Sequence, residues 1–544
     1  MSRIVGTRNR TPNPVTPASP PPVGLPVSGG TSTPTTTFEG GAAVTRSPER
    51  DLYLLCASFM FGEPTFYETV DDRVSRFRGL VSQVVAERPE FIPAFVPYLR
   101  DTLNMRTVSV VLAAEYALAV RALREADRPV GTPTSVRRVV ASALSRADEP
   151  AEFVAYWAQR TGRKTLPGGV QRGVADAVTR LYTEYSALKY DGASREWRMG
   201  DVLDLTHPTP SGTMQGALFP YLLDRRHGRA DTHADLSLLP MVAKNRELHA
   251  MPTAEARAAL LSTPGLMDEA GITWEQLSGF GPMDKDAWEA AIPTMGYMAL
   301  LRNLRNFDEK GVSDAVADKV AARIADPEQV AKSRQFPYRF LSAHRAAPSL
   351  RWGWPLERAL DAACAGIPCL PGRTLVIIDT SGSMQAGVSG RSKVSCVDAA
   401  AVLAIALAKR GADVDVVGFA DTAFEHKLTP GKSVLSEIER FSKRVGSVGY
   451  GTNIPGALDT YSGHDRVFLF SDMQTMDGHY DRGAVHRLPA HVPYYGFNLA
   501  GYGSTVIDAT RPNRYEFGGF SDSVFRLIPA LESGADQVLG MPGA

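Results

Sequence analysis

Cysteine is scarce in this sequence: there are four among 544 residues, too few and too scattered for a disulfide framework. Cys364 and Cys369 lie close together in the chain, but they lack the second pair of ligands that a zinc site needs. Cys56 and Cys396 lie far from Cys364 and from each other. We therefore expect four reduced thiols and a cytoplasmic protein.

The chain also lacks an excess of charge of either sign. Lys plus Arg and Asp plus Glu both number 59, so the formal net charge at pH 7 is zero, and no global field favours nucleic acid or a membrane surface. No apolar run approaches the roughly 20 residues of a membrane-spanning helix, and no apolar core of a signal peptide follows Arg3, Arg8 and Arg10. We expect no signal peptide and no membrane partner, so any nucleic-acid binding must come from local patches.

Apolar side chains are nearly absent before Phe38, where proline, threonine and serine dominate, as in TPNPVTPASPPPVG. Such a segment buries too little apolar surface to offset the entropy lost on ordering. We predict that residues 1–37 form a disordered, mildly basic arm. The rest of the chain is long enough for roughly two to four domains with their own cores.

From Phe38 to Arg351 the apolar residues recur with the period of a helix. The clearest example begins after Thr69, which we expect to cap the helix together with Asp72. Its apolar stripe comprises Val70, Val74, Phe77, Leu80, Val81, Val84 and Val85. Further stripes occupy residues 109–120, 173–185, 295–307 and 313–324. Because alternation of β-branched residues is nearly absent, we predict a stack of antiparallel helices.

After Pro371 short apolar strands alternate with helical segments. The predicted strands are residues 374–379, 413–420, 466–472 and 492–499, and the predicted helices are residues 394–411 and 433–445. This alternation is typical of an α/β domain with a mainly parallel, doubly wound sheet covered by helices on both faces. Ligands of such sheets bind at the carboxyl ends of the strands.

Acids and hydroxyls collect at that edge of the predicted sheet. The strand TLVIID ends at Asp379, and Ser381 and Ser383 follow it. The strand RVFLFSD ends at Asp472, and a loop between the two strands carries Thr452. These five side chains all offer hard oxygen ligands, which suit Mg²⁺ or another divalent cation.

Three other interpretations of Asp379 compete with a cation site, and the sequence lacks what two of them require. Asp, Ser and Gly are ordinary turn residues, so the strand could simply end in a polar turn. An aspartyl nucleophile of the phosphatase type would need a second acid at position 381, which is serine. An aspartic protease would need two such turns on an all-β fold, and the chain has no second copy.

The set Asp379, Ser381, Ser383, Thr452 and Asp472 resembles the metal-ion-dependent adhesion site of von Willebrand factor A domains. The family's Asp-x-Ser-x-Ser motif, its loop threonine and its second aspartate are all present. The resemblance implies a site for binding rather than turnover, in which one coordination position of the cation is left for an outside oxygen. A ligand carboxylate or a phosphate could supply that oxygen.

The helical half resembles the TROVE module of the Ro autoantigen family. The similar phrases are FEGGAAVTRSPERDLYLLCASFMFG (38–62), MRTVSVVLAAEY (105–116), DVLDLTHPTP (201–210) and IPTMGYMALLRNLRNF (292–307). The resemblance implies a monomeric ring of HEAT-like helical repeats over residues 38–370, closed with the help of an A domain over residues 371–544. It also implies binding of small noncoding Y RNAs on the outside of the ring and of single-stranded RNA ends in its central hole.

Positive charge is locally enriched in the helical half, as contacts with phosphates require. Residues 160–198 contain eight Lys or Arg against four acids, and residues 302–351 contain ten against six, whereas the chain from 371 onward has 16 basic and 18 acidic residues. A charge run on a helix is more often a solvated face, so the enrichment alone does not establish RNA binding. The residues singled out for RNA are Lys189, Arg195, His207, Arg302 and Arg305.

Some of these residues also have structural interpretations. Lys189 and His207 match positions that contact RNA in the Ro family, and a further basic family position falls near Arg195. However, His207 could instead brace the turn before Pro208. Arg302 and Arg305 could face the interior of the ring or brace neighbouring helices through carbonyl contacts.

Three hypotheses follow. The first is a non-catalytic RNA-binding scaffold that works with an exoribonuclease through bound RNA in RNA maturation, quality control or decay. The second is a protein-interaction adaptor whose A domain grips an acidic partner residue through Mg²⁺. The third is metal-dependent hydrolysis at Asp379, for which we expect no turnover.

Overall fold

The computed structural model describes residues 27–58, 62–128, 136–229, 233–390, 392–411, 413–476 and 488–533. Within these ranges no helix has both the length and the apolar character needed to cross a bilayer. All four cysteines are free thiols, as expected, and Cys56 and Cys364 are buried.

The described part of the chain begins at Val27 with an ordered segment, where we expected disorder. Strands β1 (Pro34–Thr36) and β2 (Ala42–Val44) pair antiparallel, and Val27 is only 2% exposed. The Glu516 N–H donates to the Val27 carbonyl at 2.8 Å, and the Gly29 N–H donates to the Ala509 carbonyl at 2.6 Å. The prediction of disorder is therefore wrong for residues 27–37, because residues of the C-terminal part of the chain bond to their backbone groups. The remainder of the arm lies outside the described residues.

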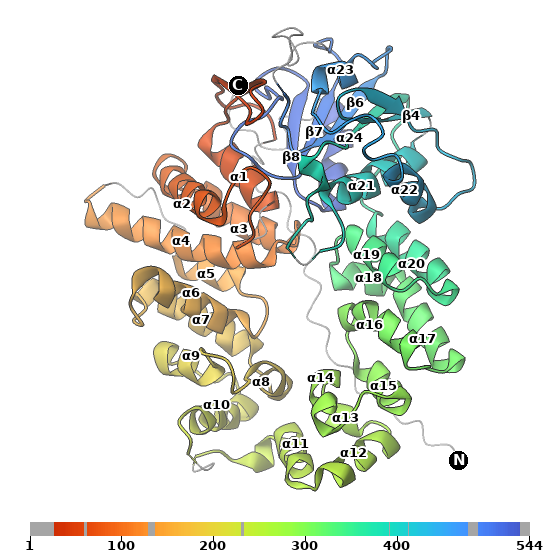
Figure 1. Ribbon diagram of the computed structural model, residues 1–544. Coiled ribbons are helices and arrows are strands. Elements are labelled where there is room, and N and C mark those ends of the chain that lie inside the picture. Colours follow the sequence, from red (N-terminus) through yellow and green to blue (C-terminus); the bar gives the residue numbers. More distant parts are fainter. Residues whose placement is uncertain are drawn as a thin grey trace.

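Helices dominate from residue 48 to residue 363 and follow one another round a ring (Figure 1). The first ten are α1 (Pro48–Ser58), α2 (Val70–Glu87), α3 (Phe91–Asp101), α4 (Arg106–Glu125), α5 (Val136–Ala143), α6 (Glu149–Thr161), α7 (Gly168–Leu181), α8 (Glu184–Tyr190), α9 (Met199–Thr206) and α10 (Thr213–Arg226). The second ten are α11 (Pro240–Ala250), α12 (Thr253–Ser262), α13 (Leu266–Glu269), α14 (Trp274–Leu277), α15 (Lys285–Ala291), α16 (Tyr297–Glu309), α17 (Asp314–Ala325), α18 (Pro327–Ser333), α19 (Tyr338–Ala346) and α20 (Leu350–Ala363).

Local sequence signals set some of these helix boundaries. Thr69 caps α2 and forms the predicted capping box with Asp72, which confirms that helix start. The helix predicted over residues 173–185 was too long, because α7 ends at Leu181 and Thr183 caps the next helix, α8. Between the two, Tyr182 adopts an extended backbone and buries its ring completely. Tertiary packing of that ring interrupts a pattern that is helical by period.

The C-terminal part is the predicted α/β domain. Its sheet comprises β3 (Arg373–Asp379), β4 (Asp413–Phe419), β5 (Ala423–Glu425), β6 (Arg466–Ser471), β7 (Tyr494–Asn498) and β8 (Arg514–Gly518). The spatial order is β5-β4-β3-β6-β7-β8, and every pair is parallel except β4 with β5. The helices of this domain are α21 (Cys396–Arg410), α22 (Val434–Ser442), α23 (Ile454–Leu458) and α24 (Ile528–Glu532).

Successive side chains of β3 pack alternately into two different hydrophobic cores, one on each face of the sheet. Val376 and Ile378 pack with α21 in a core that is continuous with the helical half. Leu375 and Ile377 pack on the other face with α23. The sheet is therefore covered on both faces, and one face joins the two halves of the molecule.

The α/β domain closes the ring between α1–α3 and α19–α20 (Figure 1). Arg345 at the end of α19 donates to Asp398 of α21 at 2.7 and 2.9 Å. The two ends of the helical half also touch directly, because Arg334 after α18 pairs with Asp101 of α3 at 3.2 Å. The closed arrangement confirms the predicted combination of a helical ring with an α/β domain.

Candidate functional site

Asp379 is the last residue of β3 and lies completely buried at the carboxyl edge of the sheet. Its Oδ1 accepts the Ser381 N–H at 2.9 Å, and its Oδ2 accepts the Ser471 hydroxyl at 2.6 Å. The hydroxyl oxygens of Ser381 and Ser383 lie 3.3 Å apart. The loop after β3 thus brings one carboxylate and two hydroxyls together.

Asp472 follows β6, the neighbour of β3 in the sheet, and is 3% exposed. Its Oδ1 accepts the Gln474 N–H at 3.2 Å. The next residue, Met473, has a φ of 65°, a left-handed conformation that is unusual for a non-glycine residue. Such outliers concentrate at functional sites, where the surrounding structure holds them in place.

Thr452 lies in the loop before α23 and is 3% exposed. Its carbonyl accepts the Thr475 hydroxyl and the Met476 N–H, each at 3.0 Å. These bonds tie the Thr452 loop to the segment that follows Asp472. Two residues earlier in the same loop, the Tyr450 carbonyl accepts the Gly382 N–H at 2.8 Å, so three loops meet at one rim.

The two carboxylates are electrostatically unsatisfied. Burial raises the pKa of Asp379 to about 6, even though Ser381 and Ser471 donate hydrogen bonds to it. Burial and then the neighbouring Asp379 charge raise the pKa of Asp472 to about 7. Within the described residues, neither carboxylate forms an ion pair with Lys, Arg or His.

This donor set fits a hard divalent cation. A cation beside Asp379 and Asp472 would offset the burial of two like charges, and Ser381, Ser383 and Thr452 add neutral oxygens. The described part of the chain contains no cluster of three or more His, Cys, Asp or Glu side chains able to hold a metal. A site of this kind therefore depends on the hydroxyls, and its cation would keep positions for water or an outside oxygen.

Lys189, one of the residues singled out for RNA, lines a cavity of about 410 Å³. The cavity is lined by residues of α8, α14, α16 and α18, helices that border the central opening of the ring in Figure 1. The Lys189 ammonium lies 5.6 Å from the Tyr185 ring centre and 5.3 Å from that of Tyr190. Burial alone would lower the pKa of Lys189, but the two tyrosines beside it raise that pKa, so the side chain stays charged.

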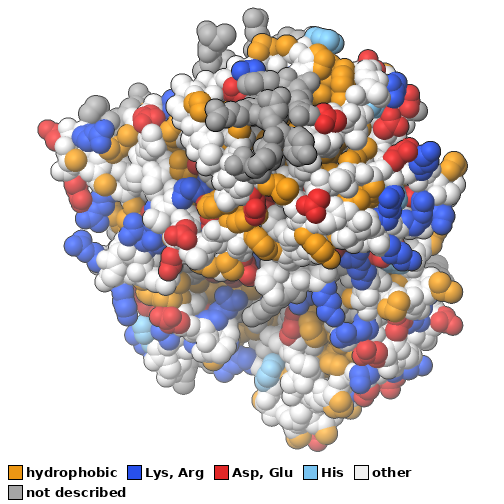
Figure 2. Space-filling view, turned by 45° about the horizontal axis from the view of Figure 1, so that its top comes forward, with side chains coloured by type: hydrophobic (Ala, Val, Ile, Leu, Met, Phe, Trp, Pro, Cys, Tyr) orange, Lys and Arg blue, Asp and Glu red, His pale blue; other side chains and the backbone are white. Residues whose placement is uncertain are grey.

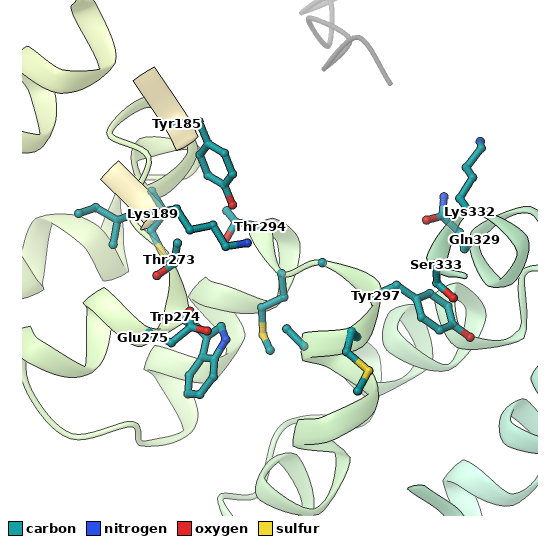
Figure 3. Close-up of a pocket in the computed structure, with 16 residues that line it drawn as sticks. Tyr185, Lys189, Thr273, Trp274, Glu275, Thr294, Tyr297, Gln329, Lys332 and Ser333 are labelled. Atoms are coloured by element: carbon teal, nitrogen blue, oxygen red, sulfur yellow. The ribbon is translucent and has the colours of Figure 1, made fainter. Parts of the chain in front are cut away.

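Aromatic rings and a second lysine complete this cavity. Figure 3 shows Lys189 extending between Tyr185 and Trp274, with Tyr297 and Lys332 farther along the wall. Trp274 is half-buried and stacks on Trp288 with ring centres 5.5 Å apart. The Tyr297 hydroxyl donates to the Ile324 carbonyl at 2.8 Å, which fixes its ring. Sequence reasoning missed these aromatic residues and Lys332, because they come from helices far apart in the chain.

The other residues singled out for RNA are exposed but lie outside this cavity. Arg195 lies in the loop between α8 and α9, and His207 directly follows α9 with a φ of 45°. Arg302 and Arg305 lie on α16, where Arg305 pairs with Glu309 at 3.4 Å. Arg302 lies one helical turn beyond Met298, a cavity residue, on the same face of α16.

Part of the basic enrichment is structural rather than available for ligands. Arg198 is 7% exposed and pairs with Asp191 at 2.5 Å. Arg160 pairs with Glu115 at 2.9 Å, and Arg180 donates to the Ala141 carbonyl at 3.0 Å. Counting Lys and Arg along the chain therefore overstates the charge open to a phosphate backbone. Lys and Arg side chains nevertheless lie on both sides of the hollow in the lower part of the view in Figure 2.

Comparison with known proteins gives matches to both halves. A family model described as TROVE domain matches residues 268–352, and one described as von Willebrand factor type A domain matches residues 374–474. The chain is 25% identical over 339 residues to Telomerase protein component 1 of Rattus norvegicus and 26% identical over 317 residues to that of Mus musculus. These alignments include 54% and 49% of this chain, but they span only 12% and 11% of the two relatives.

A solved structure shares the whole architecture. The crystal structure of the Deinococcus radiodurans Ro (RSR) protein superposes with a TM-score of 0.60 over 89% of this chain and 99% of that chain. The two sequences are 19% identical over this match, so the similarity establishes a common fold.

Proposed function

We propose that this chain, which joins a TROVE domain to a von Willebrand factor type A domain in the fold of a Ro protein, is an RNA-binding scaffold rather than an enzyme. The observation that carries the proposal is the cavity lined by residues of α8, α14, α16 and α18. It combines three aromatic rings, Tyr185, Trp274 and Tyr297, with two lysines, Lys189 and Lys332.

Such a combination fits single-stranded RNA. Bases stack on aromatic rings with little regard for sequence, while ammonium groups neutralise phosphates. The walls formed by α14, α16 and α18 lie within the residues that match the TROVE domain. We infer that the cavity receives an unpaired end of an RNA strand that enters the ring.

Two finer parts of the proposal concern partners. The exposed Arg195 and His207 support a second, outer site for a small structured RNA of the Y type. An exoribonuclease would then meet the scaffold through the bound RNA, in RNA maturation, quality control or decay. The four free thiols support the cytoplasm as the place of action.

Salt dependence provides the test of RNA binding. We expect the full chain to bind a short single-stranded RNA with an affinity that falls steeply as salt rises, because counterions are released from each neutralised phosphate. Replacing Lys189 and Lys332 by alanine should flatten the slope of log K against log salt by roughly 0.7 for each lysine removed. Lys427→Ala removes an exposed lysine of the A domain and serves as the control. No detectable binding at low salt would rule the scaffold out.

We also propose that Asp379, Ser381, Ser383, Thr452 and Asp472 hold Mg²⁺ or another divalent cation. A cation that binds only the folded chain should stabilise it by about 2.7 kcal/mol at 100 times its dissociation constant. We expect Mg²⁺ to raise the melting temperature at pH 8, where both aspartates are ionised, and to have less effect at pH 5.5, where protons compete for them. Asp379→Asn should abolish the effect at both pH values, and an unchanged response of that variant would exclude this site.

A second candidate function is the protein-interaction adaptor, and the surface near the cation site favours it. Phe38, Phe66 and Tyr450 are 55%, 58% and 64% exposed, and each lies beside a segment that carries or contacts a proposed ligand. Exposed aromatic rings are enriched in protein interfaces. Binding of an acidic partner segment that needs Mg²⁺ but no RNA would support this function.

A further inference from the structure

The segment Thr37–Gly41, which connects β1 to β2, contacts the loop that follows Asp472 at the rim of the cation site. The Thr37 hydroxyl and the Gly41 N–H both donate to the Thr475 carbonyl, at 2.5 and 3.2 Å. The Phe38 N–H donates to the Gln474 side-chain oxygen at 2.9 Å. Gln474 in turn bonds to Asp472, and Thr475 bonds to Thr452, as described above. A single hydrogen-bonded residue therefore separates this segment from each of two proposed ligands.

Tyr67 approaches the same rim from the other side of the segment. Its ring stacks on Phe38 with centres 5.2 Å apart and planes within 2°. Its hydroxyl donates to Glu39 Oε1 at 2.6 Å. Tyr67 therefore contacts the segment at two successive residues, Phe38 and Glu39.

We propose that Tyr67 and Glu39 hold the segment Thr37–Gly41 against Gln474 and Thr475 and so act as positioning residues for the loops of the cation site. Cation binding and docking of this segment then stabilise one another. The inference rests on the proposed cation site and adds to it an outer layer from the other half of the molecule. No residue of this layer belongs to the Asp-x-Ser-x-Ser pattern. The bound cation would thus stabilise the contact between the hairpin β1–β2 and the A domain, and we call this coupling the clasp.

The chemistry of the hydroxyl groups supports this arrangement. The Thr475 hydroxyl donates to the Thr452 carbonyl, while the Thr475 carbonyl accepts the Thr37 hydroxyl. The Tyr67 hydroxyl donates to the Glu39 carboxylate, so each hydroxyl keeps one orientation. Groups that orient metal ligands in this way typically change metal affinity by about 10- to 100-fold when they are removed.

Close packing leaves the segment little freedom to dock differently. A side-chain carbon at Gly41 would lie 2.3 Å from the Thr475 carbonyl oxygen, so only glycine permits the approach. Gly41→Ala should therefore lift the segment while leaving Tyr67, Glu39 and all five proposed ligands in the chain. This variant separates docking of the segment from loss of a polar group.

Cation affinity of the full chain tests the proposal. We expect Tyr67→Phe and Glu39→Gln to weaken Mn²⁺ binding, measured by titration calorimetry, by about 10- to 100-fold. Gly41→Ala should weaken it in the same direction. The matched controls are Tyr461→Phe and Glu90→Gln, which lie away from the rim and should bind as the wild type does. Melting temperatures in EDTA should be unchanged for Tyr67→Phe, which excludes a general loss of structure.

The reciprocal effect is a second readout. Mg²⁺ should slow amide hydrogen exchange over residues 37–44 in the wild type but not in Tyr67→Phe, because coupling between two sites acts in both directions. Wild-type cation affinity in Tyr67→Phe and Gly41→Ala would overturn the clasp. If Asp379→Asn also binds Mn²⁺ normally, the cation site itself is wrong; if only Asp379→Asn loses binding, the site stands without the clasp.

Discussion

Glu516→Ala is expected to lower the free energy of unfolding by about 3–5 kcal/mol, because it leaves a buried charge without its partner. The side chains of Arg46 and Glu516 are both 0% exposed and form a two-pronged pair, with N–O distances of 2.7 and 2.6 Å. Asn498 also donates to this carboxylate, at 3.0 Å. The pair joins the segment after β2 to strand β8, so its loss should open the junction of the two halves. The midpoint of chemical unfolding measures the effect.

The control for this variant is Glu425→Ala, which removes a carboxylate that is 57% exposed and should change stability by less than about 1 kcal/mol. Burial alone would raise the pKa of Glu516, but the charge and hydrogen bonds of Arg46 hold that pKa below its usual value. The pair's contribution is therefore complete above pH 4.5 and is lost as the pH falls through the lowered pKa. A Glu516→Ala variant as stable as the wild type would show that the junction does not depend on this pair.

The sequence allowed prediction of elements whose signals are local. Thr69 and Asp72 form a capping box next to an apolar stripe, and the start of α2 followed from them. The strands β3 and β6 are apolar runs ended by polar residues, and each has all or nearly all of its residues buried, as central strands of a parallel sheet do. Because adjacent parallel strands end at one edge, the meeting of Asp379 with Asp472 followed as well.

Elements that depend on distant partners could not be predicted. The hairpin β1–β2 lies in a segment poor in apolar residues, and contacts with residues more than 400 positions away order it. The end of α7 depends on where the Tyr182 ring is buried. In both cases tertiary contacts override a local pattern.

The candidate sites divide in the same way. The proposed cation ligands share a recognisable spacing, whereas the segment that Tyr67 and Glu39 contact reaches Gln474 and Thr475 only through the folded junction. Basic residues could be counted along the chain, but the count does not distinguish Lys189, which lines the cavity, from Arg198, which is buried against Asp191. Charge along a sequence thus predicts less about RNA binding than the pairing of each side chain does.

Removal of the Trp274 ring should have the largest effect on RNA binding. Stacking of one base on an aromatic ring contributes about 1–3 kcal/mol, so Trp274→Leu should weaken binding of a short single-stranded RNA by roughly 5- to 150-fold. Leucine keeps apolar volume against Trp288 while removing the aromatic face, so loss of affinity is separated from loss of packing. Fluorescence anisotropy with a labelled RNA at fixed salt measures the change.

The matched control for Trp274 is Trp354→Leu on α20, because Trp354 is 67% exposed and lies outside the cavity. If stacking is the source of the affinity, Trp274→Leu should weaken the binding of uridine-rich and adenosine-rich strands to a similar degree. The slope of log K against log salt should stay unchanged. The lysine variants should instead alter that slope. Equal RNA affinities of Trp274→Leu and the wild type would show that RNA binds outside this cavity. A loss of RNA affinity in Trp354→Leu alone would place the RNA site beside Trp354 on α20.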